Sequence, residues 1–129
     1  MPLADLFITT KDRPDLLQKS LLSLQECTPR EQYRLTVVLD GHHQDTEDVL
    51  NERNRAKWDY LLTNNKNMGL GPSINMALAH IDALKKWEDT DYCPLTVYVQ
   101  DDVQYSPGWL EKLARSFLQL ERQFKLGFA

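Results

Sequence analysis

The sequence predicts an α/β fold, a three-layer sandwich with a mainly parallel sheet. Two observations lead to this prediction. Four short apolar runs typical of buried strands alternate with longer segments of helical periodicity, and 42% of the residues are hydrophobic, enough for a real core. Strands that alternate with helices are joined by crossovers, which make neighbouring strands parallel and cover both faces of the sheet. At 129 residues the chain has the length of one domain, so we expect a single domain over residues 1–129.

The first two strand–helix units lie in the N-terminal part of the chain. Residues 6–9 form an apolar run, Pro14 suits the first position of a helix, and leucines recur at helical spacing at Leu17, Leu21 and Leu24. Residues 35–39 predict a second strand. Residues 45–57 predict a second helix with Asp45 as its N-cap.

Two further units follow. Residues 60–63 predict a short strand, and after a polar loop a helix keeps its apolar residues on one face: Ile74, Ala77, Leu78, Ile81 and Leu84. Residues 95–99 predict a fourth strand. Ser106 and Pro107 are expected to open a last helix, whose buried stripe would consist of Leu110, Leu113, Phe117, Leu120 and Phe124.

Charge and cysteine usage exclude several classes of protein. Nineteen acidic against fifteen basic residues give a net charge of −4, which argues against a nucleic-acid surface. No apolar run approaches the length that spans a bilayer. Cys27 and Cys93 lack the CxxC spacing of a zinc site, and no secretory signal precedes them, so we expect a cytoplasmic protein with free thiols.

A polar cluster follows each predicted strand. In a parallel sheet the carboxyl ends of the strands meet at one edge, and ligands bind outside that edge. We therefore expect a binding site formed by the residues that follow the four strands: Lys11, Asp12 and Arg13; Asp40, Gly41, His42 and His43; Asn64, Asn65, Lys66 and Asn67; Asp101 and Asp102.

The adjacent carboxylates Asp101 and Asp102 are the most informative of these residues. Two like charges side by side repel each other, which leaves two interpretations: a solvated strand end, or a divalent cation that offsets the repulsion.

Nucleotide-binding motifs of other classes are absent. Residues 69–71 begin a dinucleotide fingerprint, but Ile74 stands at its third glycine, and no phosphate-binding P-loop occurs.

Four segments together carry a resemblance to a known family. They are FITTKDRPDLLQKSLLSL, TVVLDGHHQDT, NKNMGLGPSINMAL and VYVQDDVQYSPGWLEKL. In this order they resemble glycosyltransferase family 2, whose members have the GT-A fold of nucleotide-diphospho-sugar transferases. The resemblance covers nearly the whole chain and corresponds to the N-terminal, nucleotide-sugar-binding half of such enzymes.

The resemblance implies a donor, a metal and an acceptor. The donor would be a nucleotide-diphosphate sugar of the UDP, GDP or dTDP type, bound with Mn²⁺ or Mg²⁺, and the acceptor an unknown hydroxyl. Asp102 would ligate the metal, and Asp101 would assist it or contact the ribose. A diphosphate beside two carboxylates is consistent with a cation between them.

The remaining roles also follow from the resemblance. The nucleoside would be contacted by Thr10 and Asp12, with Asp40 accepting a hydrogen bond from the base. Arg13 and Lys66 would approach the phosphates, although Arg13 is equally placed to cap its helix. The pocket wall would be shaped by Asn67, Gly69 and Asn75, with the glycine permitting close backbone approach.

Some positions depart from the family pattern. Gln100 replaces a common first aspartate before the acidic pair, and Leu39 replaces a common acidic residue. No residue is assigned as catalytic base, and we expect the chain to be truncated at its C-terminus. Two other interpretations remain: a noncatalytic module that binds nucleotide sugars, and a nucleotidyltransferase, which the lack of a glycine-rich, arginine-containing loop after the first strand disfavours.

Overall fold

The computed structural model describes residues 3–51, 57–87 and 95–124. Four parallel strands form one sheet in the order β3-β2-β1-β4. Their bounds are β1 Ala4–Thr10, β2 Tyr33–Asp40, β3 Tyr60–Asn64 and β4 Leu95–Val99. All four predicted strands are confirmed, β4 to the residue, because buried parallel strands are continuous apolar runs in the sequence.

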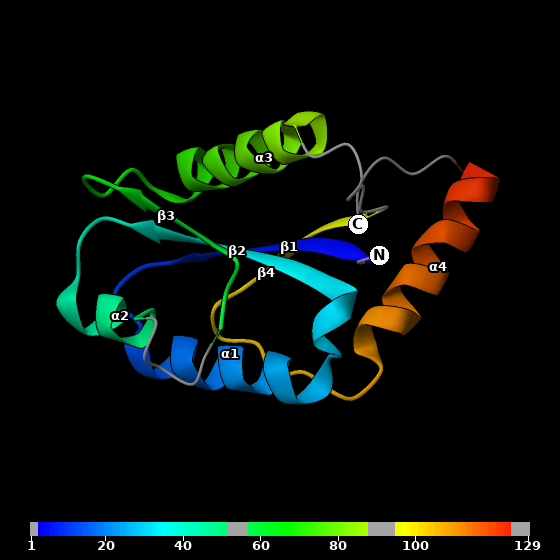
Figure 1. Cartoon of the computed structure of the whole chain (residues 1–129), viewed down its shortest axis with the longest axis horizontal. Helices are drawn as coiled ribbons and strands as arrows, with labels where there is room; N and C mark the ends of the chain where they lie inside the picture. Colours follow the sequence, from blue (N-terminus) through cyan, green and yellow to red (C-terminus); the bar gives the residue numbers. More distant parts are fainter. Residues whose placement is uncertain (1–2, 52–56, 88–94, 125–129) are drawn as a thin grey trace.

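Helices cover both faces of the sheet, which confirms the predicted α/β architecture. Figure 1 shows α3 on one face and α1 and α2 on the other, with α4 beside the β4 edge. The helices are α1 Pro14–Cys27, α2 Gln44–Val49, α3 Leu70–Trp87 and α4 Trp109–Phe124, and a 3₁₀ turn, Arg30–Gln32, leads into β2. None of the described helices is long and apolar enough to cross a membrane.

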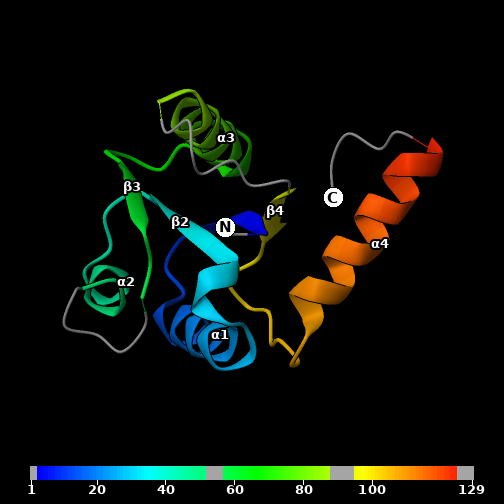
Figure 2. The same cartoon turned by 45° about the vertical axis from the view of Figure 1, so that its right-hand side comes forward.

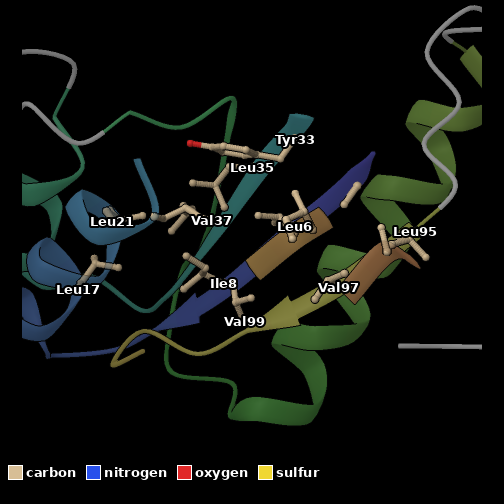
Figure 3. Close-up of a cluster of buried hydrophobic side chains, with 14 of the residues drawn as sticks. Leu6, Ile8, Leu17, Leu21, Tyr33, Leu35, Val37, Leu95, Val97 and Val99 are labelled. Carbon is tan, nitrogen blue, oxygen red and sulfur yellow. The ribbon is translucent and has the colours of Figure 1, made fainter. Parts of the chain in front are cut away.

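The core has one cluster on each face of the sheet. The larger packs α1 and the first half of α4 against alternate residues of β1, β2 and β4, such as Leu6, Val37 and Val97 (Figure 3). The smaller packs Ala77 and Ile81 of α3 against Phe7 and Val38 on the opposite face. The alternation of side chains along each strand divides the residues between the two layers.

The start of α2 differs from the prediction. Its N-cap is His43, whose Nδ1 accepts a hydrogen bond from the Thr46 N–H at 3.4 Å, so the assignment of Asp45 as N-cap was wrong. An imidazole nitrogen can accept this bond as a carboxylate would. The described helix ends at Val49, earlier than predicted, and residues 52–56 of the predicted helix lie outside the described residues.

The last helix also differs. It starts at Trp109 rather than at Ser106 and Pro107, because Gly108 adopts a φ of 79°, which a right-handed helix excludes. Leu110 and Phe117 are buried as predicted, but Leu120 is 43% exposed and is not part of the buried stripe. The Phe124 side chain lies outside the described residues. Figure 2 shows the later turns of α4 extending away from the sheet, which explains the exposure of Leu120.

A buried ion pair joins the first two strands at the amino edge of the sheet. Asp5 and Arg34 are register partners, and Arg34 donates to both carboxylate oxygens of Asp5, at 2.7 and 3.1 Å. Their side chains are 2% and 10% exposed. Removing one partner of such a pair leaves an uncompensated buried charge, which costs far more than the pair itself contributes.

We therefore expect Asp5→Ala to lower the free energy of unfolding by about 3–5 kcal/mol. Replacing both residues, in Asp5→Leu with Arg34→Met, should recover most of that loss because no charge remains buried. Urea unfolding measures both effects. The control is Asp82→Ala, which removes a surface pair with Lys86 and should change the value by less than about 1 kcal/mol. Equal losses in Asp5→Ala and Asp82→Ala would contradict the prediction.

Candidate functional site

A cavity of about 520 Å³ opens at the carboxyl edge of the sheet, where the sequence predicted a site. Residues from the ends of β1, β2 and β4, from the loop before α3 and from the first turn of α3 line it. They are Thr9, Thr10, Lys11, Arg13, Asp40, Asn67, Gly69, Leu70, Ser73, Tyr98, Gln100, Asp101 and Asp102. Segments far apart in the sequence thus meet because all four strands run the same way.

One side of the cavity carries the acidic pair. Asp101 is buried; its Oδ2 accepts a hydrogen bond from the Thr10 hydroxyl at 2.9 Å, and its Oδ1 lies 3.4 Å from Arg13 Nη1. Arg13 Nη1 also lies 3.6 Å from Asp102 Oδ2, and the Asp102 side chain is 42% exposed. Arg13 thus offsets the repulsion between the two carboxylates. It stands at the N-cap position of α1, but its side chain makes no capping hydrogen bond.

The other side of the cavity is built around Asp40 at the end of β2. Its carboxylate accepts hydrogen bonds from Asn64 Nδ2 at 3.0 Å, from the Met68 N–H at 2.7 Å and from the Gly69 N–H at 2.9 Å. Asn64 is the register partner of Asp40 and also donates to the buried Ser73 hydroxyl in the first turn of α3, at 3.2 Å. Asp40 therefore ties β2, β3 and the start of α3 together.

The loop that Asp40 holds has little conformational freedom. With its amide nitrogen turned toward Asp40, Asn67 donates to Oδ2 at 2.8 Å and its oxygen accepts from Lys11. Gly41 has a φ of 89°, and a Cβ there would lie 3.4 Å from the Asn67 nitrogen. Gly69 has a φ of 92°, a backbone conformation that is strained for every residue with a Cβ.

These contacts set the protonation state of Asp40. Burial of the carboxylate opposes ionisation, but hydrogen bonds from the Met68 N–H, the Asn64 amide and the Gly69 N–H, with the nearby Lys11 charge, outweigh it and lower the pKa of Asp40. The N-terminus of α3, which begins at Leu70, also favours an anion at this point. Asp40 is therefore ionised at neutral pH.

The residues on the acidic side have the chemistry of a site for a hard divalent cation. Mg²⁺ and Mn²⁺ prefer oxygen ligands, and Mg²⁺ is often held by one or two carboxylates together with substrate phosphates. Within the described parts of the chain, no three His, Cys, Asp or Glu side chains gather to hold a metal ion. A cation at Asp101 and Asp102 would therefore need oxygens from a ligand or from water, and the pair fits that requirement.

Seven of the predicted site residues lie together on the cavity wall: Thr10, Arg13, Asp40, Asn67, Gly69, Asp101 and Asp102. Three others do not line it. Asp12 has a φ of 52° and its side chain lies 3.9 Å from His43 Nδ1, while Lys66 and Asn75 are exposed. The binding roles assigned to all ten residues stay predictions.

Sequence reasoning missed several residues of the wall. Thr9 and Tyr98, whose hydroxyls lie 3.1 Å apart, reach the cavity from the face of the sheet that α3 covers. Each is a strand neighbour of residues in the larger core cluster, such as Ile8 and Val97. Because successive side chains of a strand point to opposite faces of the sheet, this alternation could have placed Thr9 and Tyr98 on the face that α3 covers. Lys11 was among the residues expected at this edge, whereas Leu70 and Ser73 carried no comparable signal, because helix-start side chains have no fixed direction.

The chain matches the model of a family described as glycosyl transferase family 2 over residues 5–127. The chain belongs to glycosyltransferase family 2. The family predicted from the four sequence segments is thus confirmed, and glycosyl transfer is the reaction class that the family represents.

Solved structures agree with this family at the level of the fold. A crystal structure of S. aureus TarS residues 1–349 is 19% identical to this chain with a TM-score of 0.68, and a second TarS crystal structure is 18% identical with a TM-score of 0.69. Each match covers 95% of this chain but only 33% and 20% of the respective TarS chains. No curated protein sequence matches the chain. The GT-A type of fold is therefore confirmed for this family 2 domain.

The lowered pKa of Asp40 predicts a pH dependence of stability. The folded-state pKa lies below the ordinary value of 3.8, so the ionised carboxylate stabilises the fold fully above about pH 3.8, and this contribution is lost as pH falls through the folded pKa. Asp40→Asn lacks it at every pH. The difference in unfolding free energy between the parent and Asp40→Asn should therefore be constant from pH 7 to about 5 and shrink below about pH 3.8. Urea unfolding over this range measures it, and a difference that stays constant down to pH 2 would contradict the assignment.

Proposed function

We propose that this family 2 domain binds a nucleotide-diphosphate sugar together with Mn²⁺ or Mg²⁺ and presents the sugar for transfer to an acceptor hydroxyl. One observation carries the proposal: the half-exposed Asp102 beside the buried Asp101 borders a cavity of about 520 Å³ at the edge where α/β sheets bind ligands. Because the chain spans a third or less of the TarS chains that it matches, the activity of a whole enzyme is part of this proposal.

Asp102 and Asp101 would hold the cation. When bound, it would neutralise the negative charge that develops on the diphosphate leaving group. Asp102 is the better ligand, because its described protein contact is an ion pair at 3.6 Å, beyond hydrogen-bond length. Asp101 already accepts a hydrogen bond from Thr10, which fixes its orientation at the strand end.

Arg13 and Lys11 supply positive charge where the phosphates would lie. Both line the cavity, and Arg13 reaches both carboxylates of the acidic pair. We propose that the guanidinium of Arg13 binds a phosphate oxygen once a cation takes over its place between the carboxylates. The acidic pair would thus face a positive charge in both states: Arg13 in the free protein, and the cation when the nucleotide is bound.

The nucleoside would lie between the two sides of the cavity. Thr10, Asn67 and Gly69 border this space, and Asp40, which also lines the cavity, holds Gly69 through its backbone N–H. The predicted contributions of Asp12, Lys66 and Asn75 require side-chain movement toward the ligand, since they do not line the cavity. The donor that we propose is of the UDP, GDP or dTDP type, and no residue is assigned as catalytic base. The cytoplasmic location stays a prediction from cysteine usage.

The main test is the metal dependence of nucleotide binding. Asp102→Ala should abolish the gain in affinity that Mn²⁺ gives to a nucleoside diphosphate, because the cation loses its most accessible protein ligand. The loss should be at least about tenfold, or 1.4 kcal/mol. Titration calorimetry with UDP, GDP and dTDP, each with and without Mn²⁺, measures it.

The matched control for this test is Asp45→Ala, which removes an exposed carboxylate on α2, away from the cavity. It should bind as the parent does. Both variants should unfold within about 1 kcal/mol of the parent, since exposed carboxylates add little stability. An unchanged Mn²⁺ effect in Asp102→Ala would overturn the assignment of the metal ligand, and a parent that binds none of the nucleotides would overturn the proposed function.

Arg13 should affect Mn²⁺ and nucleotide binding in opposite directions. Arg13→Ala should tighten the binding of Mn²⁺ alone by up to about fivefold, since a half-exposed ion pair contributes about 0.2–1 kcal/mol. The same variant should weaken binding of the nucleoside diphosphate with Mn²⁺, because a phosphate ligand is lost. Mn²⁺ binding is followed by electron paramagnetic resonance. Lys86→Ala, an equal charge change at the far end of α3, should do neither, and parallel changes in both affinities would contradict the prediction.

A further inference from the structure

We infer that Asp40 is a positioning residue, which acts on the nucleotide through the loop before α3 and not by direct contact with the nucleobase. The inference rests on the proposed function, in that it takes the cavity to be a nucleotide site. It concerns the group that holds one wall of that site in place.

The acceptor capacity of Asp40 is the first argument. A carboxylate offers about four lone-pair positions, two on each oxygen. Oδ1 accepts from Asn64 Nδ2 and the Met68 N–H, and Oδ2 accepts from the Gly69 N–H and the Asn67 amide, at distances between 2.7 and 3.0 Å. A base N–H that approached Asp40 would have to displace one of these donors.

The position of the donors is the second argument. Three of the four come from consecutive residues of one loop, Asn67, Met68 and Gly69, and two of these residues line the cavity. The fourth donor, Asn64, extends the network to the Ser73 hydroxyl in the first turn of α3. Asp40 therefore fixes both the loop and the helix start that together form one wall.

The burial of the network is the third argument. Asp40 is 8% exposed, Asn64 is 4% exposed and Ser73 is fully buried, so this network is shielded from solvent on the side away from the cavity. The buried amide of Asn64 would carry a desolvation cost if it lost this acceptor, whereas the Met68 and Gly69 N–H groups are only part-buried. Without the carboxylate, the Met68 and Gly69 N–H groups would have to find water, and the wall would lose its fixed shape.

Direct and indirect roles make different predictions for base preference. The N3 position of uracil carries an N–H that a carboxylate can accept, whereas N3 of cytosine is itself an acceptor. A direct contact would therefore favour UDP over CDP, and Asp40→Asn would remove that preference. A positioning role lowers the affinity for both nucleotides by the same factor and keeps the ratio of their dissociation constants.

The experiment compares the parent, Asp40→Asn, Asn64→Ala and the control Asp45→Asn. Asn64→Ala removes a partner of Asp40 that does not line the cavity, and Asp45→Asn makes the same charge change on the exposed side of α2. Titration calorimetry with UDP·Mn²⁺ and CDP·Mn²⁺ gives both dissociation constants. Hydrogen exchange followed by NMR reports on the Met68 and Gly69 amides.

We expect Asp40→Asn to weaken both nucleotides about tenfold with a ratio within twofold of the parent value, and Asn64→Ala to reproduce the effect more weakly. Exchange of the Met68 and Gly69 amides should speed up at least tenfold in Asp40→Asn and stay unchanged in Asp45→Asn. If Asp40→Asn does not fold, the same two measurements on Asn64→Ala test the inference: the ratio of the UDP and CDP dissociation constants, and the exchange rates of the Met68 and Gly69 amides.

Two outcomes would overturn the inference alone: loss of the UDP preference in Asp40→Asn, or unchanged exchange of the two amides. Failure of the parent to bind any nucleoside diphosphate would instead overturn the proposed function, and the inference with it. The two kinds of failure are thus distinguishable.

Discussion

The parallel register of the sheet is the constraint on which the rest of the structure depends. β1 lies between β2 and β4, so the ends of three strands stand side by side, and Asp40 at the end of β2 is paired with Asn64 at the end of β3. Thr10 and Asp101 form a hydrogen bond although 91 positions separate them in the sequence. Because every strand runs in the same direction, every strand-to-helix loop leaves at the same edge, and the polar residues gather there. The buried Asp5–Arg34 pair stands at the opposite edge, so this ion pair is spatially separate from the cavity.

The aspartates on the two sides of the cavity differ in how many further hydrogen bonds or cation contacts their carboxylates can accept, because their surroundings differ. The oxygens of Asp40 accept hydrogen bonds from four donors, whereas Asp102 is half-exposed and contacts Arg13 at 3.6 Å. A carboxylate whose lone pairs are all used stabilises the protein around it, and one with free lone pairs can bind a cation or a ligand. The number of donors that the fold delivers to each carboxylate thus separates a carboxylate whose acceptor positions are filled from one whose positions are free. Residue type alone does not.

The sequence by itself determined the architecture of this protein. Strands buried on both faces are mainly apolar, so their positions could be recognised without knowing their partners; all eight residues of β2 are buried, although Arg34, Thr36 and Asp40 are polar. Pro14 marked the start of α1 because its fixed φ and missing N–H suit the first helical position. The four polar clusters, taken with the alternation of strands and helices, were enough to predict the edge at which the cavity lies. The family assignment followed from the same segments.

Only the tertiary structure decided which polar side chains meet in the cavity and which do not. Lys11 lines it and Asp12 does not, although both follow β1, because the direction of a loop side chain depends on backbone angles and on donors from other segments. The start of α2 was misplaced for a related reason, since the acceptor that caps it is an imidazole nitrogen. The partners of Asp40 lie 24 to 29 positions away in the sequence, and no local pattern encodes such contacts. Hydrophobic periodicity is a local property and fixes the elements, but the satisfaction of buried polar groups is a property of the folded chain, and it determined the site.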